Sequence, residues 1–295
     1  MEPVRIGVIG GSGLYSMPEV SDVTEIRIDT PFGTPSDAII IGKVRGQRVA
    51  FLPRHGRGHV HTPTEVPYRA NIYALKTLGV SHVIAVSACG SLKETLAPGH
   101  IVIPDQLFDF TKDERGRSFF GKGLVGHVGV ADPFCVDLSK LVAAACREAG
   151  GTVHEGGTSV TIEGPRFSTR GESHVWQQLG FSIIGMTTSP EAFLAREAEM
   201  HYAVMAHVTD YDVWHDEPVT SDMVFKQFAA NITLAQRAVA LAIEKIAASI
   251  ASTTTHCGCE SALASAIATA KERIPAETLI ALKPIVGKYL TKVED

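Results

Sequence analysis

The sequence predicts an α/β protein in which helices pack on one twisted sheet. Short β-branched runs, such as residues 4–9 and 82–86, alternate along the chain with longer segments, such as 68–78, whose apolar residues recur at helical spacing. Such alternation is typical of a sheet covered by helices. The chain has 295 residues and no internal repeat, and α/β folds of this length are commonly one domain.

In the N-terminal part of the chain, apolar β-branched runs predict strands at residues 4–9, 38–44, 48–53, 82–86 and 100–104. The turn Arg45-Gly46-Gln47 separates the second run from the third and predicts a hairpin. The helix predicted over 68–78 ends before Gly79, a residue that suits the position after a helix. The small residues from Ser87 to Ser91 predict a turn after the fourth strand.

Residues 105–134 are polar and rich in glycine, and we expect a functional or interface loop because other loops of this length are uncommon. Beyond it, helices are predicted over 136–149, 172–179, 190–200 and 219–249, and strands over 158–162, 182–185 and 202–208. Pro190 opens one of these helices, where its missing N–H costs little. Two further helices are expected after Ala251.

The composition excludes several classes of protein. A formal net charge of −5 gives no basic surface for nucleic acid. The apolar run at residues 6–9 is too short for a signal peptide or a membrane span, so no membrane partner is expected. Five cysteines in this length do not make a disulfide scaffold, and we expect a reducing, cytoplasmic location.

An acidic pair follows the apolar run at residues 202–208. If the strand geometry persists, Asp210 and Asp212 project to the same side, because successive side chains alternate between faces. Two carboxylates placed in this way can grip a planar, nitrogen-rich ring that offers an N–H donor, or they can bind a cation. The less favoured alternative is that they are helix-cap or surface residues.

Two segments near the N-terminus suit an anion. The loop Gly10-Gly11-Ser12-Gly13 follows a strand, and its backbone N–H groups can cradle an anion or form a tight turn. It is not a dinucleotide fingerprint, because Ser16 occupies the third glycine position. Arg54-His55 follows another strand, and the planar fork of an arginine fits phosphate oxygens.

A metal site is the alternative for the second segment, because His55, His59 and His61 lie close together in the sequence. The interleaved arginines, Arg54 and Arg57, would repel a divalent ion, so phosphate is the favoured ligand there.

Hydroxyl side chains end two further predicted strands, at Ser87-Ala88 and at Thr187-Thr188. Such residues commonly cap helices or form turns, but binding crevices of α/β proteins also form at strand ends. Phe167 follows a strand as well, and it either stacks on a base or packs in the core. An anion site beside a carboxylate site for a base suggests chemistry between phosphate and a nucleoside.

Taken together, these residues resemble the 5′-methylthioadenosine phosphorylase branch of the trimeric purine nucleoside phosphorylase family. The resemblance runs from about Val4 to Ala251. The segments that carry it are Ile9-Gly10-Gly11-Ser12-Gly13-Leu14, Asp29-Thr30-Pro31-Phe32-Gly33, Arg54-His55-Gly56, Ala88-Cys89-Gly90-Ser91-Leu92, Thr161-Ile162-Glu163-Gly164-Pro165-Arg166-Phe167, Met186-Thr187-Thr188, Pro190-Glu191 and Thr209-Asp210-Tyr211-Asp212.

The resemblance implies a nucleoside-phosphorylase-like single domain over residues 1–251 with a mixed, partly barrel-like central sheet. Residues 252–295 are then a C-terminal helical extension packed on the same domain. It also implies a homo-oligomer, either a trimer or a dimer of trimers. The tail carries Cys257-Gly258-Cys259, which is similar to a motif in some archaeal relatives. Two free thiols are favoured there over a strained disulfide.

The family pattern also implies roles for individual residues. The expected phosphate ligands are Ser12, Arg54, His55, Ser87, Ala88 and Thr187. The expected nucleoside contacts are Met186 at the ribose, Phe167 beside the base, and Thr209, Asp210 and Asp212 at the purine. His127, in the long loop, is expected to reach the 5′ end of the substrate across a subunit interface.

The reaction implied is reversible phosphorolysis of 5′-methylthioadenosine to adenine and 5-methylthioribose 1-phosphate. A protonated Asp210 near N7 would act as general acid, and Asp212 would accept from the 6-amino group. Inorganic phosphate is a co-substrate, and no metal or organic cofactor is expected. The alternatives are a broader 6-aminopurine (adenosine) or other purine nucleoside phosphorylase, a nucleosidase, and a nucleoside-binding protein without activity.

Overall fold

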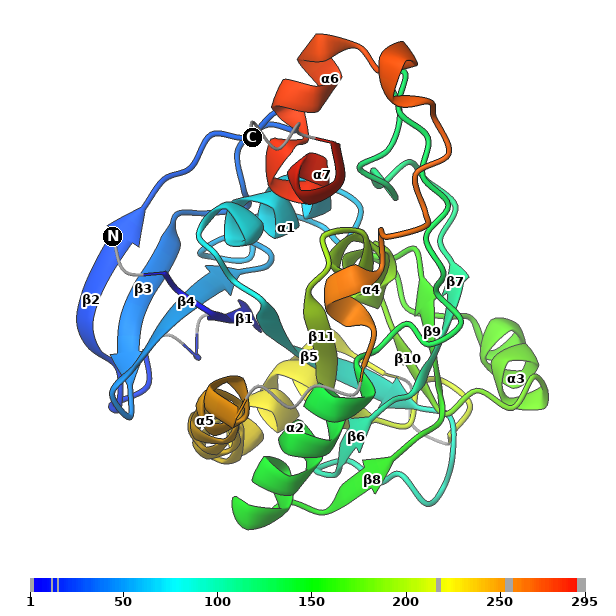
Figure 1. Ribbon diagram of the computed structural model, residues 1–295. Coiled ribbons are helices and arrows are strands. Elements are labelled where there is room, and N and C mark those ends of the chain that lie inside the picture. Colours follow the sequence, from blue (N-terminus) through cyan, green and yellow to red (C-terminus); the bar gives the residue numbers. More distant parts are fainter. Residues whose placement is uncertain (1–2, 12, 15, 216–218, 253–256, 291–295) are drawn as a thin grey trace.

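The computed structural model describes residues 3–11, 13–14, 16–215, 219–252 and 257–290 (Figure 1). Within this part of the chain, eleven strands join into one mixed sheet. The strands are β1 (Ile6–Gly10), β2 (Ser21–Ile26), β3 (Ile39–Val44), β4 (Gln47–Pro53), β5 (His82–Ser91), β6 (Ile101–Ile103), β7 (Gln106–Phe110), β8 (Val153–Glu155), β9 (Thr158–Ile162), β10 (Ile183–Gly185) and β11 (His201–Asp210). The helices are α1 (Tyr68–Thr77), α2 (Val136–Glu148), α3 (Arg170–Gln178), α4 (Thr188–Glu197), α5 (Ser221–Ser252), α6 (Ala276–Ala281) and α7 (Lys283–Leu290). The predicted fold class, a single α/β domain with helices flanking a central sheet, is confirmed.

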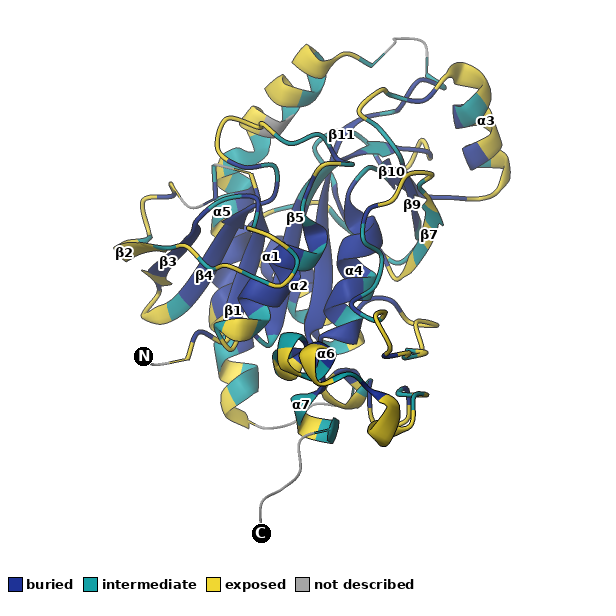
Figure 2. Ribbon diagram, turned by 90° about the horizontal axis from the view of Figure 1, so that it is seen from above, coloured by how far each residue is buried: buried dark blue, intermediate teal, exposed yellow. Residues whose placement is uncertain are grey.

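Helices cover the central strands on both faces. On one face α2 and α5 pack together and bury Val142, Ala238 and Ile243 against the sheet, while α1 and α4 bury Ile72 and Leu194 on the other. Figure 2 shows the result, with the central strands buried and α3 and α6 largely exposed. Because both faces of the central strands are covered, β1 and β11 are buried along their whole length. No described helix is both long and apolar enough to cross a membrane.

The sheet divides at β5. On one side of β5, β1 pairs with it only as far as Ile9 beside Ala85, and β10 begins to pair only at Gly90. On the other side β11 follows β5 from His82 to Gly90. Residues 86–89 therefore have a neighbouring strand on one side only. The backbone groups on the open side have to find other partners, and this opening is where the cavity described below lies.

Most predicted elements are present, but some differ in extent from the prediction and some strands were not predicted. The turn predicted from Ser87 to Ser91 belongs to β5, because β11 continues to pair with these small residues. The predicted long loop contains β7, an edge strand that pairs with β9. Two short or exposed strands, β2 and β8, were not predicted, because neither carries a buried apolar run.

The C-terminal extension packs on the same body of structure. Tyr73 in α1 donates a hydrogen bond of 2.8 Å to the carbonyl of Ala281. From α7, Ile285 and Val286 are buried in the hydrophobic core that α1 and α4 share. Both helices expected after Ala251 are present within residues 257–290.

Candidate active site

A cavity of about 720 Å³ lies where the sheet divides. It is lined from β1, β4, β5, β10 and β11, from the loop after β9 and from the first turns of α5. Many of the predicted binding residues meet here, namely Arg54, His55, Ser87, Ala88, Phe167, Met186, Thr187, Thr209, Asp210 and Asp212. This cavity is therefore the candidate active site.

Two predicted residues are not among those that line the cavity. Ser12 lies outside the described residues, although its neighbours Gly11 and Gly13 line the cavity. His127 is exposed in the loop between β7 and α2 and does not line the cavity of its own chain. A direct role for His127 would therefore require the cavity of a second copy of the chain.

Arg54 is the buried cation at one end of the cavity. Its Nε and Nη2 donate to the two carboxylate oxygens of Glu191 at 2.8 and 2.9 Å. Its Nη1 donates at 3.0 Å to the carbonyl of Val86, on the stretch of β5 that has a neighbouring strand on one side only. Although burial disfavours its charged form, Glu191 more than compensates and raises the pKa of Arg54 above its ordinary value.

The contacts of Arg54 leave donors for a ligand. A guanidinium has five N–H groups, and the bonds to Glu191 and Val86 use one each on Nε, Nη1 and Nη2. One N–H therefore remains on each terminal nitrogen. Arg57, the other arginine of this segment, instead forms ion pairs with Glu25 and Asp37 at 2.9 and 3.4 Å and does not line the cavity.

His55, the residue after Arg54, is held as a neutral ring. Burial, and then the charge of Arg54, lower the pKa of His55 to about 4. Its Nδ1 lies 2.9 Å from the carbonyl of His61. Since a carbonyl only accepts, Nδ1 carries the proton and Nε2 is left as an acceptor. A neutral ring of this tautomer can accept a hydrogen bond from a protonated phosphate oxygen.

Further donors come from strand ends and from a helix start. Ser87 and Ala88 belong to the stretch of β5 that has a neighbouring strand on one side only, and both line the cavity. Thr187 is the N-cap residue of α4, and its side chain makes no capping hydrogen bond. This end of the cavity therefore combines a cation, hydroxyl groups and backbone N–H groups, which together suit a small oxyanion.

The acidic pair lies at the other end. Both carboxylates line the cavity. However, the predicted reason, that side chains alternate between the two faces of a regular strand, is wrong. The pairing of β11 with β5 shifts between Val208 and Asp210, so that Thr209 and Asp210 both face the cavity. Asp212 lies beyond the end of β11, with a φ of 51°. An irregular strand end followed by a left-handed residue thus brings both carboxylates to one place.

Burial keeps this pair from ionising easily. Asp210 and Asp212 are both buried, and neither forms an ion pair with any described residue. Their hydrogen bonds are neutral: Asp210 accepts from the hydroxyl of Thr209 at 2.7 Å and from the backbone N–H of Asp212 at 2.8 Å, and Asp212 accepts from Ser173. Burial raises the pKa of both carboxyl groups above the ordinary value. This end of the cavity can therefore hold a carboxylic acid that donates a proton.

An apolar wall completes the cavity. Val224, Phe225 and Ile232 from the start of α5 line it together with Met186. Phe167 is half-buried at the cavity, so the alternative that it belongs to the hydrophobic core is wrong. A flat, partly apolar ligand would fit between these side chains.

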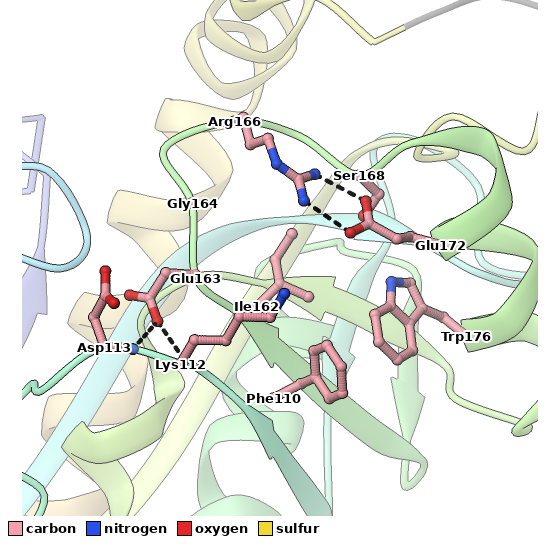
Figure 3. A pocket seen from close by; sticks show the side chains of 10 residues that line it. All are labelled: Phe110, Lys112, Asp113, Ile162, Glu163, Gly164, Arg166, Ser168, Glu172 and Trp176. Atoms are coloured by element: carbon pink, nitrogen blue, oxygen red, sulfur yellow. Dashed lines mark hydrogen bonds and ion pairs between the residues drawn. The ribbon is translucent and has the colours of Figure 1, made fainter.

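A second pocket of about 250 Å³ adjoins this cavity (Figure 3). Two of its charged side chains, Glu163 and Arg166, already have partners. Glu163 accepts from the backbone N–H groups of Lys112 and Asp113, and Arg166 pairs through two 2.8 Å bonds with Glu172. These contacts hold the loop that carries Phe167, while Ser168 Oγ and Trp176 Nε1 have no hydrogen-bond partner among the described residues.

The sequence analysis missed two residues that support the site. Glu191 was noticed in the motif Pro190-Glu191, but nothing local shows that it pairs with Arg54, which is 137 residues away. Ser173 lies in α3 and gave no signal at all. The apolar wall from α5 was also missed, because an amphipathic helix start has no distinctive pattern.

Several known proteins are similar to this chain along most of its length. Residues 5–248 match the sequence model of the phosphorylase superfamily. Over 291 residues the chain is 53% identical to the S-methyl-5′-thioadenosine phosphorylase of Chloroflexus aurantiacus, covering 98% of this chain and 99% of the relative. It is similar to the crystal structure of a methylthioadenosine phosphorylase from an Antarctic soil metagenomic library, with a TM-score of 0.90, 46% identity and coverage of 97% and 99% of the two chains. It is also similar to methylthioadenosine phosphorylase from Schistosoma mansoni in complex with adenine, with a TM-score of 0.79, 40% identity and coverage of 83% and 92%.

The buried ion pair predicts an effect on stability. Glu191→Gln keeps the shape but leaves Arg54 as an uncompensated buried cation, and breaking such a pair typically costs ~3–5 kcal/mol. We expect a large fall in the free energy of unfolding, measured by denaturant titration. Glu155→Gln is the matched control, because it breaks the exposed pair with Arg147 and should change stability little. Equal losses in the two variants would contradict a structural role for Glu191.

Proposed function

Because the chain belongs to the phosphorylase superfamily, we propose that it is a pentosyltransferase that catalyses the reversible phosphorolysis of 5′-methylthioadenosine to adenine and 5-methylthioribose 1-phosphate. One observation carries this proposal. A single cavity joins an anion-binding end around Arg54 to a buried acidic end at Asp210 and Asp212. Phosphorolysis needs both, because phosphate attacks one side of the glycosidic bond while negative charge builds on the base at the other.

The anion-binding end provides the nucleophile. Two N–H groups of Arg54 that Glu191 and Val86 leave unused bind phosphate oxygens, together with donors from Ser87, Ala88 and Thr187. The neutral ring of His55 accepts from a protonated phosphate oxygen. Phosphate held in this way attacks C1′ and also provides the counter-charge to the oxocarbenium-like sugar. We propose that this chemistry needs no metal or organic cofactor.

The acidic end stabilises the leaving group. Asp210, held as a carboxylic acid by burial, donates its proton to N7 as the base departs. An oxygen of Asp212 accepts from the 6-amino group of adenine, and Ser173 holds that carboxyl group in place. A 6-oxopurine would present an acceptor at the same position, and the mismatch disfavours it.

The apolar wall determines which 5′ substituent is preferred. Val224, Phe225 and Ile232 offer no hydrogen bond to a 5′-hydroxyl group, and burying such a group without a partner is unfavourable. A 5′-methylthio group loses nothing there. These contacts support methylthioadenosine over adenosine as the preferred substrate, with adenosine as the broader alternative.

We propose that the active unit is a trimer or a dimer of trimers. His127 and its loop neighbours Val125 and Val130 are exposed, and so are Phe108 and Phe110 on the edge strand β7. Exposed apolar groups of this size on one region of chain are typical of subunit interfaces. All five cysteines are unpaired in the structure, which supports our proposal of a reducing, cytoplasmic location.

The function is tested by omitting phosphate. Purified protein incubated with methylthioadenosine should release adenine only when inorganic phosphate is present, and the sugar product should be 5-methylthioribose 1-phosphate. Arg54→Ala should raise the KM for phosphate far more than the KM for the nucleoside. Arg57→Ala is the control and should change neither, because its side chain does not line the cavity. Undiminished cleavage without phosphate, with release of free methylthioribose, would identify a hydrolase instead.

The role of His127 is tested by mixing two defective subunits. His127→Ala should raise the KM for methylthioadenosine and leave the KM for phosphate unchanged. Co-expression with Asp210→Asn subunits should restore a fraction of sites with the wild-type KM, because one subunit then supplies Asp210 and its neighbour His127. A fully active monomer in light scattering, or mixtures without restored sites, would refute a shared site.

A further inference from the structure

Four side chains from distant parts of the chain converge outside the active site. Cys135 is the N-cap residue of α2, His201 begins β11, and Cys257 and Cys259 lie in the C-terminal extension. Their sulfur and nitrogen atoms all lie within 4.8 Å of one another. None of the four lines the active-site cavity.

The spacing of these atoms is that of ligands around one small ion. The Sγ of Cys135 lies 3.4 Å from the Sγ of Cys257 and 3.3 Å from Nδ1 of His201, and the Sγ of Cys257 lies 3.2 Å from the same nitrogen. Tetrahedral zinc with Zn–S of ~2.3 Å and Zn–N of ~2.0 Å separates its ligands by about 3.5 to 3.8 Å. These three separations need to widen by only a few tenths of an ångström, and the separations within the cluster that exceed 3.8 Å, none above 4.8 Å, need to shorten by at most about 1 Å. A disulfide would instead need about 2.05 Å between sulfurs.

Hydrogen-bond partners surround the four side chains on their outer side. Arg196 donates to the Sγ of Cys259 at 3.3 Å, and the backbone N–H of Leu138 donates to the Sγ of Cys135 at 3.4 Å. The other ring nitrogen of His201, Nε2, lies 3.4 Å from a carboxylate oxygen of Glu260. A carboxylate on the far nitrogen of a histidine, and donors aimed at the sulfurs, are the outer contacts that orient metal ligands.

We propose that Cys135, His201, Cys257 and Cys259 bind one Zn²⁺ ion in a structural site. Four protein ligands close the coordination sphere, so the ion has no open position for catalysis. Binding replaces the three thiol protons, which pass to solvent. Zinc and three thiolates carry a net charge of −1, and the guanidinium of Arg196 beside Cys259 offsets it.

This site would fasten the C-terminal extension to the catalytic domain and, through the extension, the loop of His127. Beyond the ligands Cys257 and Cys259, the extension runs back along that loop. The backbone N–H of His127 donates to Ala266 at 2.8 Å, Gly126 pairs with Ile267, and Val125 donates to the hydroxyl of Thr269 at 2.8 Å. Insofar as His127 has the role given under the proposed function, zinc would position a residue for the neighbouring active site while lying outside both cavities.

The site is tested by metal analysis of the full chain, purified under reducing conditions without a polyhistidine tag or chelator. We expect about one zinc per chain by mass spectrometry. The double variant Cys257→Ser/Cys259→Ser should lose it. Cys146→Ala is the matched control, because Cys146 is a buried free thiol outside the cluster and should leave the zinc content unchanged. Cobalt added to the zinc-free protein should give the intense visible bands of a tetrahedral thiolate site.

The proposed effect of zinc on the C-terminal extension can be measured separately from zinc content. In the double variant, amide hydrogen exchange should become faster in the extension and at residues 125–127 but stay unchanged in β5. These measurements do not depend on turnover, so the zinc site and the proposed function can fail separately. Wild-type protein that binds neither zinc nor cobalt, a double variant that keeps its zinc, or a Cys257–Cys259 disulfide in freshly lysed cells would each overturn the proposal.

Discussion

The candidate active site depends on the energetic cost of removing charged side chains from water. Arg54 is buried, and it remains a cation because Glu191 is buried against it with two hydrogen bonds. Asp210 lies in the same cavity without a cation beside it, so the same desolvation raises its pKa and favours the protonated form. One physical constraint therefore favours an anion at one end of the cavity and a protonated carboxyl group at the other.

The divided sheet explains why these two ends meet. Because β1 stops beside Ala85 and β10 starts only at Gly90, the stretch of β5 between them keeps one open side. Arg54 fills part of that opening and satisfies the carbonyl of Val86. Crevices at such points are where α/β folds bind ligands. The fold thus leaves residues 86–89 without a neighbouring strand on one side, at the end of the cavity where Arg54 lies, and β11, on the other side of β5, ends in the acidic pair.

Local patterns predicted what depends on local sequence. The strand runs, the helices and the short motifs at Arg54, Thr187 and Asp210 are each written within a few residues, and the cavity brings these motifs together. Contacts between distant segments could not be predicted, because pattern carries no distance information. The pairing of Glu191 with Arg54 is one example, and the meeting of Cys135 and His201 with Cys257 and Cys259 is another. Edge strand β7 was missed because none of its residues is buried, so its sequence has no apolar run of the kind that predicts a core strand.

The most direct test of this account is the protonation of Asp210 itself. Carbon-13 in the side-chain carboxyl group of aspartate allows each aspartate to be titrated by nuclear magnetic resonance, and the signal lost in Asp210→Asn identifies the right one. The account predicts that Asp210 titrates clearly above the ordinary carboxyl value of 3.8. A value at or below it would mean that the buried carboxyl group is ionised, and that it cannot be the proton donor at the base.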